Sequence, residues 1–163
     1  DSWYSRSAHA APAHPRLQGR ETADVVVLGA GLTGLSAALE LAQAGLRVIV
    51  VEAKRVGWGA SGRNGGQVIF GIGCEQPKIA AMVGPEQSPR MLDWSLEGVR
   101  LVRERIAAHG IDAGWRDGHA HVAIKPRHID ELKAWQGDLA ENYGYALPWW
   151  DREQLRAQLE SPR

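Results

Sequence analysis

The sequence contains a single cysteine, Cys74, and no excess of charge of either sign. One cysteine cannot form an intrachain disulfide, which fits a reducing compartment and predicts a cytoplasmic protein. Lys and Arg together number 19, as do Asp and Glu, so the formal net charge is zero. Because proteins that bind phosphate backbones usually carry a basic excess, nucleic acid is not expected as a partner.

Long apolar runs are also missing. No segment approaches the roughly 18–20 consecutive apolar residues that cross a bilayer, so no membrane span is expected. No basic-then-apolar leader and no internal repeat is recognised. The apolar fraction of 44% and the 163 residues suit about one globular domain. The ends, Asp1 and Ser161-Pro162-Arg163, predict a piece of a longer protein.

The first ordered segment is expected to begin near Asp24. Val25–Leu28 is a continuous apolar run, mostly β-branched, which predicts a strand buried on both faces. Residues 32–44 repeat apolar side chains at helical spacing and are followed by Gly45, a residue type that commonly closes a helix. Val48–Val51 is a second buried strand of the same kind. The sequence therefore predicts a strand–helix–strand unit whose parallel strands are joined by a right-handed crossover.

Simpler patterns follow. Residues 85–89, bounded by two prolines, predict a loop. Residues 92–106 and 129–143 repeat apolar side chains every three or four positions, which predicts two amphipathic helices. Between them, the Asp-Gly step within residues 115–124 predicts a β-hairpin. Asp151, with Gln154 three positions later, predicts a capping box that opens a last helix.

The turn after the first strand reads GAGLTG from Gly29 to Gly34, a G-x-G-x-x-G pattern. A strand before it, a helix after it and the acid Glu52 at the end of the second strand make this a dinucleotide-binding fingerprint. In that motif the first glycine allows the tight turn, Gly31 lets a pyrophosphate approach the backbone, and the last packs helix on strand. Glu52 can accept hydrogen bonds from ribose hydroxyls and would repel a 2′-phosphate, which disfavours NADP.

A second glycine-rich stretch, GWGASGRNGGQ, runs from Gly57 to Gln67. An NAD-binding domain would usually continue from the acid through another helix to a third parallel strand. Here residues 53–56 carry no helical pattern and lead directly into the glycines, which favours FAD. An NAD-linked dehydrogenase and a non-catalytic nucleotide-binding fragment remain the alternatives.

The segment DVVVLGAGLTGLSAALELAQAGLRVIVVEAKRVGWGASGRNGGQ resembles the N-terminal FAD-binding segment of the D-amino-acid oxidase-like flavoproteins. Within them it is most similar to the gamma-glutamylputrescine oxidoreductase group, and MLDWSLEGVRLVRERIAAHGID, WRDGHAHVAI and the N-terminal aromatic residues also fit that group. The resemblance implies an α/β fold: a Rossmann-like FAD-binding βαβ unit followed by the start of an α+β substrate domain. It divides the chain into an extended arm (1–20), the N-terminal part of the FAD-binding domain (21–88) and a helical segment that begins the substrate domain (89–163).

The resemblance also implies an activity. FAD would oxidise an amine or amino acid by taking a hydride at flavin N5, the imine product would hydrolyse, and oxygen or another electron acceptor would reoxidise the flavin. A gamma-glutamylputrescine-like substrate is implied by the group. Nothing in the sequence identifies a catalytic acid or base. Members of the family are much longer, so the remainder of the polypeptide is expected to be needed to complete the fold, and the isolated chain is expected to be inactive.

Carried over residue by residue, the resemblance implies FAD contacts in three stretches. The pyrophosphate would lie against Gly29, Gly31, Leu32, Thr33 and Gly34. The adenosine end would lie near Glu52, which takes the ribose, and near Ala53 and Arg55. Phosphates or the ribityl chain would touch Ala60, Ser61, Arg63 and Asn64, and the isoalloxazine would be approached by Gly65, Gly66 and Gln67.

Three of these side chains have donors that suit the cofactor. Ser61 and Asn64 offer neutral donors, and Arg63 offers a charged fork for phosphate or a reduced flavin. The alternative for Arg63 is a surface salt bridge. His119 and His121, on one face of the predicted hairpin, could hold a metal ion, but no third ligand is suitably spaced and no metal site is expected.

Overall fold

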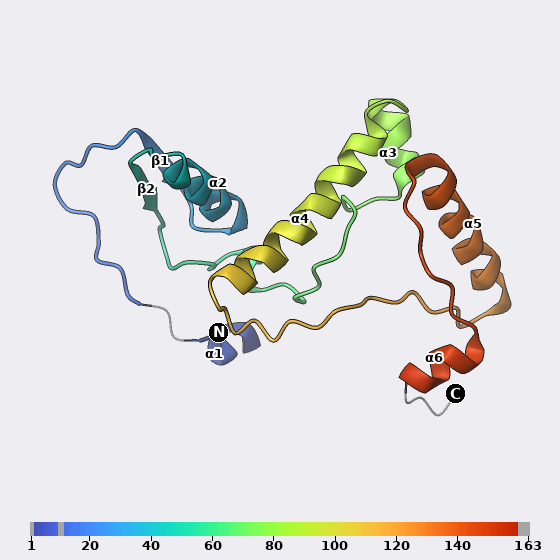
Figure 1. Cartoon of the computed structure of the whole chain (residues 1–163). Helices are drawn as coiled ribbons and strands as arrows, with labels where there is room; N and C mark the ends of the chain where they lie inside the picture. Colours follow the sequence, from blue (N-terminus) through green and yellow to red (C-terminus); the bar gives the residue numbers. More distant parts are fainter. Residues whose placement is uncertain (1, 10–11, 160–163) are drawn as a thin grey trace. The chain divides into compact units, whose positions relative to one another are not determined.

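A computed structural model describes residues 2–9 and 12–159. The chain divides into two compact units, Asp1–Gln67 and Val68–Arg163. The helices and strands labelled in Figure 1 are α1 (Trp3–Ser7), β1 (Val25–Leu28), α2 (Leu32–Gln43), β2 (Val48–Val51), α3 (Gln76–Val83), α4 (Ser88–Ala108), α5 (Pro126–Tyr143) and α6 (Arg152–Gln158). A short 3₁₀ turn, η1 (Ala60–Gly62), lies between β2 and α3. The predicted division into an arm, an FAD-binding part and a substrate part, with boundaries after residues 20 and 88, stays a prediction.

The first unit contains the predicted strand–helix–strand motif. β1 and β2 pair in parallel, with Val25 opposite Val48 and Leu28 opposite Val51, and α2 connects them. The end of α2 has the full hydrogen-bond pattern of a Schellman motif, because the Leu46 N–H donates to the Leu41 carbonyl and the Gly45 N–H to the Ala42 carbonyl. The prediction of two parallel strands around a helix that closes at Gly45 is confirmed.

The prediction that both strands are buried on both faces is wrong for the described residues. Val25 and Val27 are half-buried, whereas Val26 is 55% exposed and Leu28 is 83% exposed. Successive strand side chains point to opposite faces of a sheet, so one face lies against α2 and the other has no cover from the described chain. An apolar run therefore predicted the strands correctly but not what covers them.

The second unit is built from α3 to α6 around Ile79, Leu92 and Leu139, which are buried. Two buried polar side chains also join its helices: Gln76 Nε2 donates to the Ser88 carbonyl at 2.9 Å and to Ser88 Oγ at 3.0 Å. Ser88 Oγ lies 3.1 Å from Tyr143 Oη of α5. The two amphipathic helices predicted at 92–106 and 129–143 are confirmed as α4 and α5, and α5 ends at Gly144 in the left-handed conformation.

Two local predictions need correction, and one helix was missed. The residues predicted as an extended arm include a short helix, α1, in which Ser7 Oγ donates to the Trp3 carbonyl. The loop predicted at 85–89 already contains the start of α4 at Ser88, because a proline in the first turn of a helix loses no hydrogen bond. The helix α3 was not predicted at all.

The predicted β-hairpin at 115–124 is also wrong, since the structure describes these residues without a strand. Asp117 is instead tied to other side chains: its Oδ1 accepts from Trp115 Nε1 at 2.9 Å, and its Oδ2 pairs with Arg103 of α4 at 2.8 Å. The capping box at the start of α6 is confirmed, because the Asp151 side chain accepts from the Gln154 N–H and the Gln154 side chain accepts from the Asp151 N–H.

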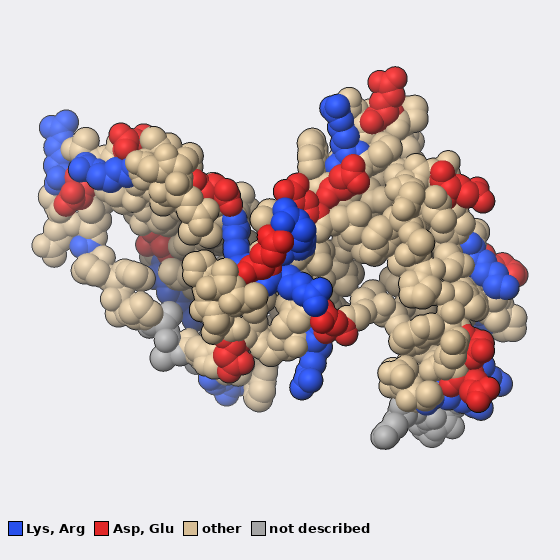
Figure 2. All heavy atoms as spheres, viewed as in Figure 1, with Lys and Arg blue, Asp and Glu red and all other residues tan. Residues whose placement is uncertain are grey.

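Charged side chains of both signs are interspersed on the face drawn in Figure 2, as the zero net charge suggests. On α4, for example, Arg100 pairs with Glu104 at 2.6 Å and with Glu97 at 3.4 Å. All three side chains are more than half exposed, so these pairs contribute little to stability. Among the described residues, no helix combines the length and the hydropathy required of a membrane span.

Candidate functional site

The fingerprint turn joins β1 to the first turn of α2. The Gly29 N–H donates to the Val51 carbonyl at 2.8 Å, which extends the pairing of the two strands to the start of the turn. A side chain at Gly34 would collide with the Gly29 carbonyl oxygen and would lie 3.2 Å from a methyl group of Val27. The helix therefore packs against the turn at a separation that only glycine permits, as the motif predicts.

The N-terminus of α2 keeps donors available. A helix leaves its first backbone N–H groups without partners inside the helix. The N-cap residue Gly31 has no side chain that could cap it, and the Leu32 N–H donates instead to Ser61 Oγ at 2.9 Å. The N–H groups of Thr33 and Gly34 have no acceptor among the described residues. Two unpaired donors at a positive helix end suit an anionic group such as a diphosphate.

Glu52 follows β2 directly, and its carboxylate lies against the same turn. Oε2 accepts from the Ala30 N–H at 2.9 Å, and Oε1 accepts from the Lys54 N–H at 2.8 Å. These backbone donors, Ala30 first and then Lys54, lower the pKa of the Glu52 carboxyl below its usual value. The side chain is therefore a carboxylate at neutral pH, and each oxygen retains a lone pair that can accept from a hydroxyl group.

The second glycine-rich segment is attached to the fingerprint at two points. The Gly57 N–H donates to the Ala30 carbonyl at 2.9 Å, and Ser61 Oγ accepts from the Leu32 N–H. A Cβ added at Gly31 would lie 3.0 Å from Ser61 Oγ, so the serine hydroxyl already occupies the space beside that glycine. In the structure the Ser61 oxygen caps α2, which leaves the hydroxyl proton available, and the predicted donation to the cofactor stays a prediction.

Asn64 shapes its own loop. Its Nδ2 donates to the carbonyls of Ala60 at 3.2 Å and Ser61 at 3.0 Å, and its Oδ1 accepts from the Gly66 N–H at 2.9 Å. The amide thereby closes η1 and orients the two glycines that follow. The predicted role of Asn64 as a donor to the cofactor did not include this part in the loop, although an Asn two residues before a glycine is a recognised turn signal.

Arg63 lies against Trp58. Its Nε donates to the Gly59 carbonyl at 3.2 Å, and its guanidinium lies 5.7 Å from the centre of the Trp58 ring. Arg55 lies 5.5 Å from the same ring, so one indole carries two cation–π contacts. No carboxylate pairs with Arg63 among the described residues, which does not support the salt-bridge alternative.

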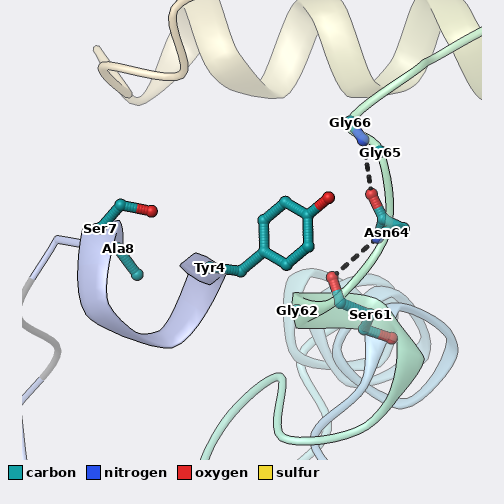
Figure 3. A pocket seen from close by; sticks show the side chains of 8 residues that line it. All are labelled: Tyr4, Ser7, Ala8, Ser61, Gly62, Asn64, Gly65 and Gly66. Carbon is teal, nitrogen blue, oxygen red and sulfur yellow. Dashed lines mark hydrogen bonds between the residues drawn. The ribbon is translucent and has the colours of Figure 1, made fainter. Parts of the chain in front are cut away.

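The remaining predicted contacts lie at the edges of this arrangement. Ala53 and Arg55 are exposed beyond Glu52, and Ala60 opens η1. Gly65 and Gly66 line a pocket of about 340 Å³, and Gln67 is the residue directly after it. The pocket is completed by Tyr4, Ser7 and Ala8 in and beside α1, residues that no motif in the sequence connects with the site (Figure 3).

Outside this unit, His119 and His121 lie with their ring centres 4.8 Å apart, and His121 lies 4.9 Å from the Trp135 ring. No group of three or more His, Cys, Asp and Glu side chains that could hold a metal ion occurs in the described part of the chain. The two histidines therefore belong to an aromatic cluster that also includes Phe70.

A parallel βαβ unit, a glycine-lined helix N-terminus and an acid after the second strand define a dinucleotide-binding protein of the Rossmann-like type. The chain belongs to the family of FAD dependent oxidoreductases designated DAO, which it matches over residues 24–162. The predicted family and the predicted cofactor, FAD, are confirmed, and the alternative of an NAD-linked dehydrogenase is set aside.

Curated relatives cover nearly the whole chain. It is 40% identical over 161 residues to the "Probable oxidoreductase OrdL" of Haemophilus influenzae, a match that covers 98% of this chain and 37% of that protein. It is 37% identical over 163 residues to the gamma-glutamylputrescine oxidoreductase of Escherichia coli, covering 99% and 38% respectively. It is 34% identical to the OrdL protein of Rhizobium meliloti, covering 98% and 38%. The chain thus spans well under half the length of these relatives, and no solved structure matches it.

Proposed function

We propose that the site described above binds FAD for the oxidation of an amine or amino acid at the carbon beside its nitrogen. The observation that carries the proposal is the junction of three parts at one turn: the N-terminus of α2, the Glu52 carboxylate and the glycine-rich segment 57–67, joined through Ala30, Leu32 and Ser61. Each part offers what one portion of FAD needs.

The pyrophosphate is assigned to the fingerprint, where the unpaired N–H groups of Thr33 and Gly34 offset its negative charge. Gly29 leaves the backbone open to it, whereas the space beside Gly31 is taken by the Ser61 hydroxyl, so Gly31 would contribute through its backbone groups. Leu32 contributes through its bond to Ser61 rather than through a free N–H. The phosphate contacts of this stretch are therefore backbone contacts, which depend on the fold and not on side-chain charge.

The ribose is assigned to Glu52, whose oxygens each keep an acceptor position after binding the backbone of Ala30 and Lys54. Ala53 and Arg55 follow on the adenosine side. Ala60, Ser61, Arg63 and Asn64 form the wall of the ribityl and phosphate region, with Asn64 and Ser61 acting mainly by holding the loop. Gly65, Gly66 and Gln67 are assigned to the isoalloxazine.

Bound FAD would supply the hydride acceptor that the protein itself lacks. The chain's own residues would hold the cofactor, fix its ring against a wall of bare backbone and exclude water from it. The amine substrate is supported by the 37% identity with a relative named for gamma-glutamylputrescine, and a related substrate with a terminal amine is proposed here. An electron acceptor, oxygen or another, is required to complete the cycle.

Anaerobic mixing tests this function directly. The protein should be expressed with the coding sequence that flanks these residues in its gene, purified with FAD bound, and mixed with gamma-glutamylputrescine, free putrescine, D- and L-amino acids, or 1,4-butanediol. We expect loss of the visible flavin absorbance with an amine and none with the diol, which has hydroxyl groups where putrescine has amines. Reduction by the diol alone, or by NADH alone, would contradict the proposal.

A further inference from the structure

The pocket in the first unit has two chemically different walls. One wall is the loop from Ser61 to Gly66, in which the glycines present backbone without side chains. The other wall is α1 with the residue directly after it, and it consists of Tyr4, Ser7 and Ala8. Figure 3 shows the Tyr4 ring extending from α1 toward the part of the loop that carries Asn64, Gly65 and Gly66.

The side chains of α1 and of Ala8, whose N–H donates to the Tyr4 carbonyl, line the pocket with one helical face. Positions 4, 7 and 8 are three and four residues apart, which places them on the same side of a helix. Trp3, the neighbouring aromatic residue, does not line the pocket and is 72% exposed. Two adjacent aromatic side chains on one short helix therefore have different surroundings.

The two hydroxyl groups on the α1 wall also differ in their hydrogen bonding. Ser7 Oγ donates its proton to the Trp3 carbonyl at 3.0 Å, so this hydroxyl is engaged within the helix. The Tyr4 hydroxyl has no hydrogen-bond partner among the described residues. Tyr4 thus brings to the pocket both an aromatic face and a hydroxyl group that can bind a ligand.

A space between an aromatic ring and bare glycine backbone suits a flat heteroaromatic ligand. Its volume of about 340 Å³ falls within the range of roughly 300–1,000 Å³ that is typical of small-molecule pockets. The loop wall is the stretch assigned above to the isoalloxazine, through Gly65 and Gly66. We propose that α1 forms the opposite wall of the flavin-ring site and that Tyr4 contacts the isoalloxazine as a positioning residue.

This inference rests on the proposed binding of FAD but not on the identity of the substrate. It gives the N-terminal residues a function: α1 covers the ring end of the cofactor and excludes water from it. An uncovered ring would face solvent on that side. Tyr4 would hold the ring against Gly65 and Gly66 by packing, with its hydroxyl available to a ring heteroatom.

Flavin fluorescence tests the contact. An excited flavin accepts an electron from a tyrosine that touches it and returns the electron without emitting light, whereas phenylalanine is too hard to oxidise to do so. We therefore expect Tyr4→Phe in the FAD-loaded protein to raise the emission of bound flavin severalfold while FAD content stays near that of the wild type. Trp3→Phe is the matched control, because tryptophan quenches equally well but lies outside the pocket, and its emission should equal that of the wild type.

The outcomes separate this inference from the proposed function. Unchanged emission in Tyr4→Phe with full FAD content would overturn the contact and leave the amine oxidation standing. Raised emission without any reduction by amines would support the contact and contradict the substrate proposal. Tyr4→Ala provides a second measurement: it should shift the visible flavin spectrum and speed the release of FAD, and a spectrum and release rate equal to those of Trp3→Ala would count against the inference.

Discussion

At the scale of single residues, Glu52 and Ser61 hold the site together. The Glu52 carboxylate accepts hydrogen bonds from the backbone N–H groups of Ala30 and Lys54. It therefore fixes the direction in which the chain leaves β2. Ser61, which lies 29 residues after Leu32, supplies the cap for the Leu32 N–H that Gly31 cannot provide. Both residues act on the backbone first, and cofactor binding depends on the backbone they arrange.

Glu52 should make the stability of the unit depend on pH. Its pKa is lowered in the folded chain, so its contribution is present above the unfolded value of 4.5 and is lost as the pH falls through the folded value. Glu52→Gln should therefore lower the melting temperature by a few degrees near neutral pH, and this difference should narrow below pH 4.5. Circular dichroism melts over a pH series measure it.

Glu21→Gln is the matched control, since Glu21 is exposed and precedes the sheet. It should melt like the wild type at every pH. A difference between Glu52→Gln and the wild type that stays constant through acid pH would show that the charge of Glu52 does not contribute. The sign of the pH dependence is what distinguishes a stabilising carboxylate from a residue that matters only for its shape.

At the scale of elements, glycines close to each end of α2 determine where the helix begins and ends. Its C-terminus closes with a Schellman motif at Gly45, and its N-terminus lies so close to the preceding turn that Gly34 has no room for a side chain. The helix could therefore be located from the sequence with little error. Its first turn is the element on which the pyrophosphate assignment depends.

Two glycine-to-alanine substitutions test this packing, because one should lower the free energy of unfolding and the other should raise it. Gly34→Ala would force a methyl group against the Gly29 carbonyl, and overpacking of this kind costs about 1–3 kcal/mol. Gly98→Ala lies within α4 with no atom near the added methyl group, and it should stabilise the chain by about 0.5–1 kcal/mol. Thermal or urea unfolding measures both. Equal effects of the two substitutions would contradict the close packing of α2 on the turn.

At the scale of the whole molecule, the first unit presents a sheet of two strands with one apolar face uncovered. Val26 and Leu28 are exposed on that face, although the sequence of the strands is that of a buried parallel sheet. A pair of strands is marginally stable in water by itself, and here α2 packs against only one face of the pair. The relatives are more than twice as long as this chain, so additional segments are available in such proteins to cover that face.

We therefore expect the 163 residues alone to retain FAD poorly. Expressed by themselves, they should copurify with much less than one FAD per chain, whereas the same residues with their flanking coding sequence should be yellow. Flavin absorbance released on denaturation, divided by protein concentration, gives the ratio. One FAD per chain on the 163 residues would show that the first unit is sufficient for binding.

Much of the fold followed from short-range patterns. The strands at Val25–Leu28 and Val48–Val51, the helix between them and the capping box at Asp151 depend on residues within a few positions of one another, and these predictions are confirmed. The hairpin predicted around Asp117 failed because that carboxylate pairs with Arg103, a contact that no local pattern contains. The helix α1 was missed because five residues are too few to show a period.

The sequence by itself determined the βαβ unit, the fingerprint and the family, because these depend on apolar spacing and on glycines at set positions. Only the tertiary structure decided what the polar side chains bind. Ser61 and Asn64, predicted as donors to the cofactor, bind the backbone of the site, and Tyr4, within the predicted extended arm, lines a pocket. Hydrogen bonds and pockets join residues that are distant in the chain, so their partners are fixed only once the elements are in place.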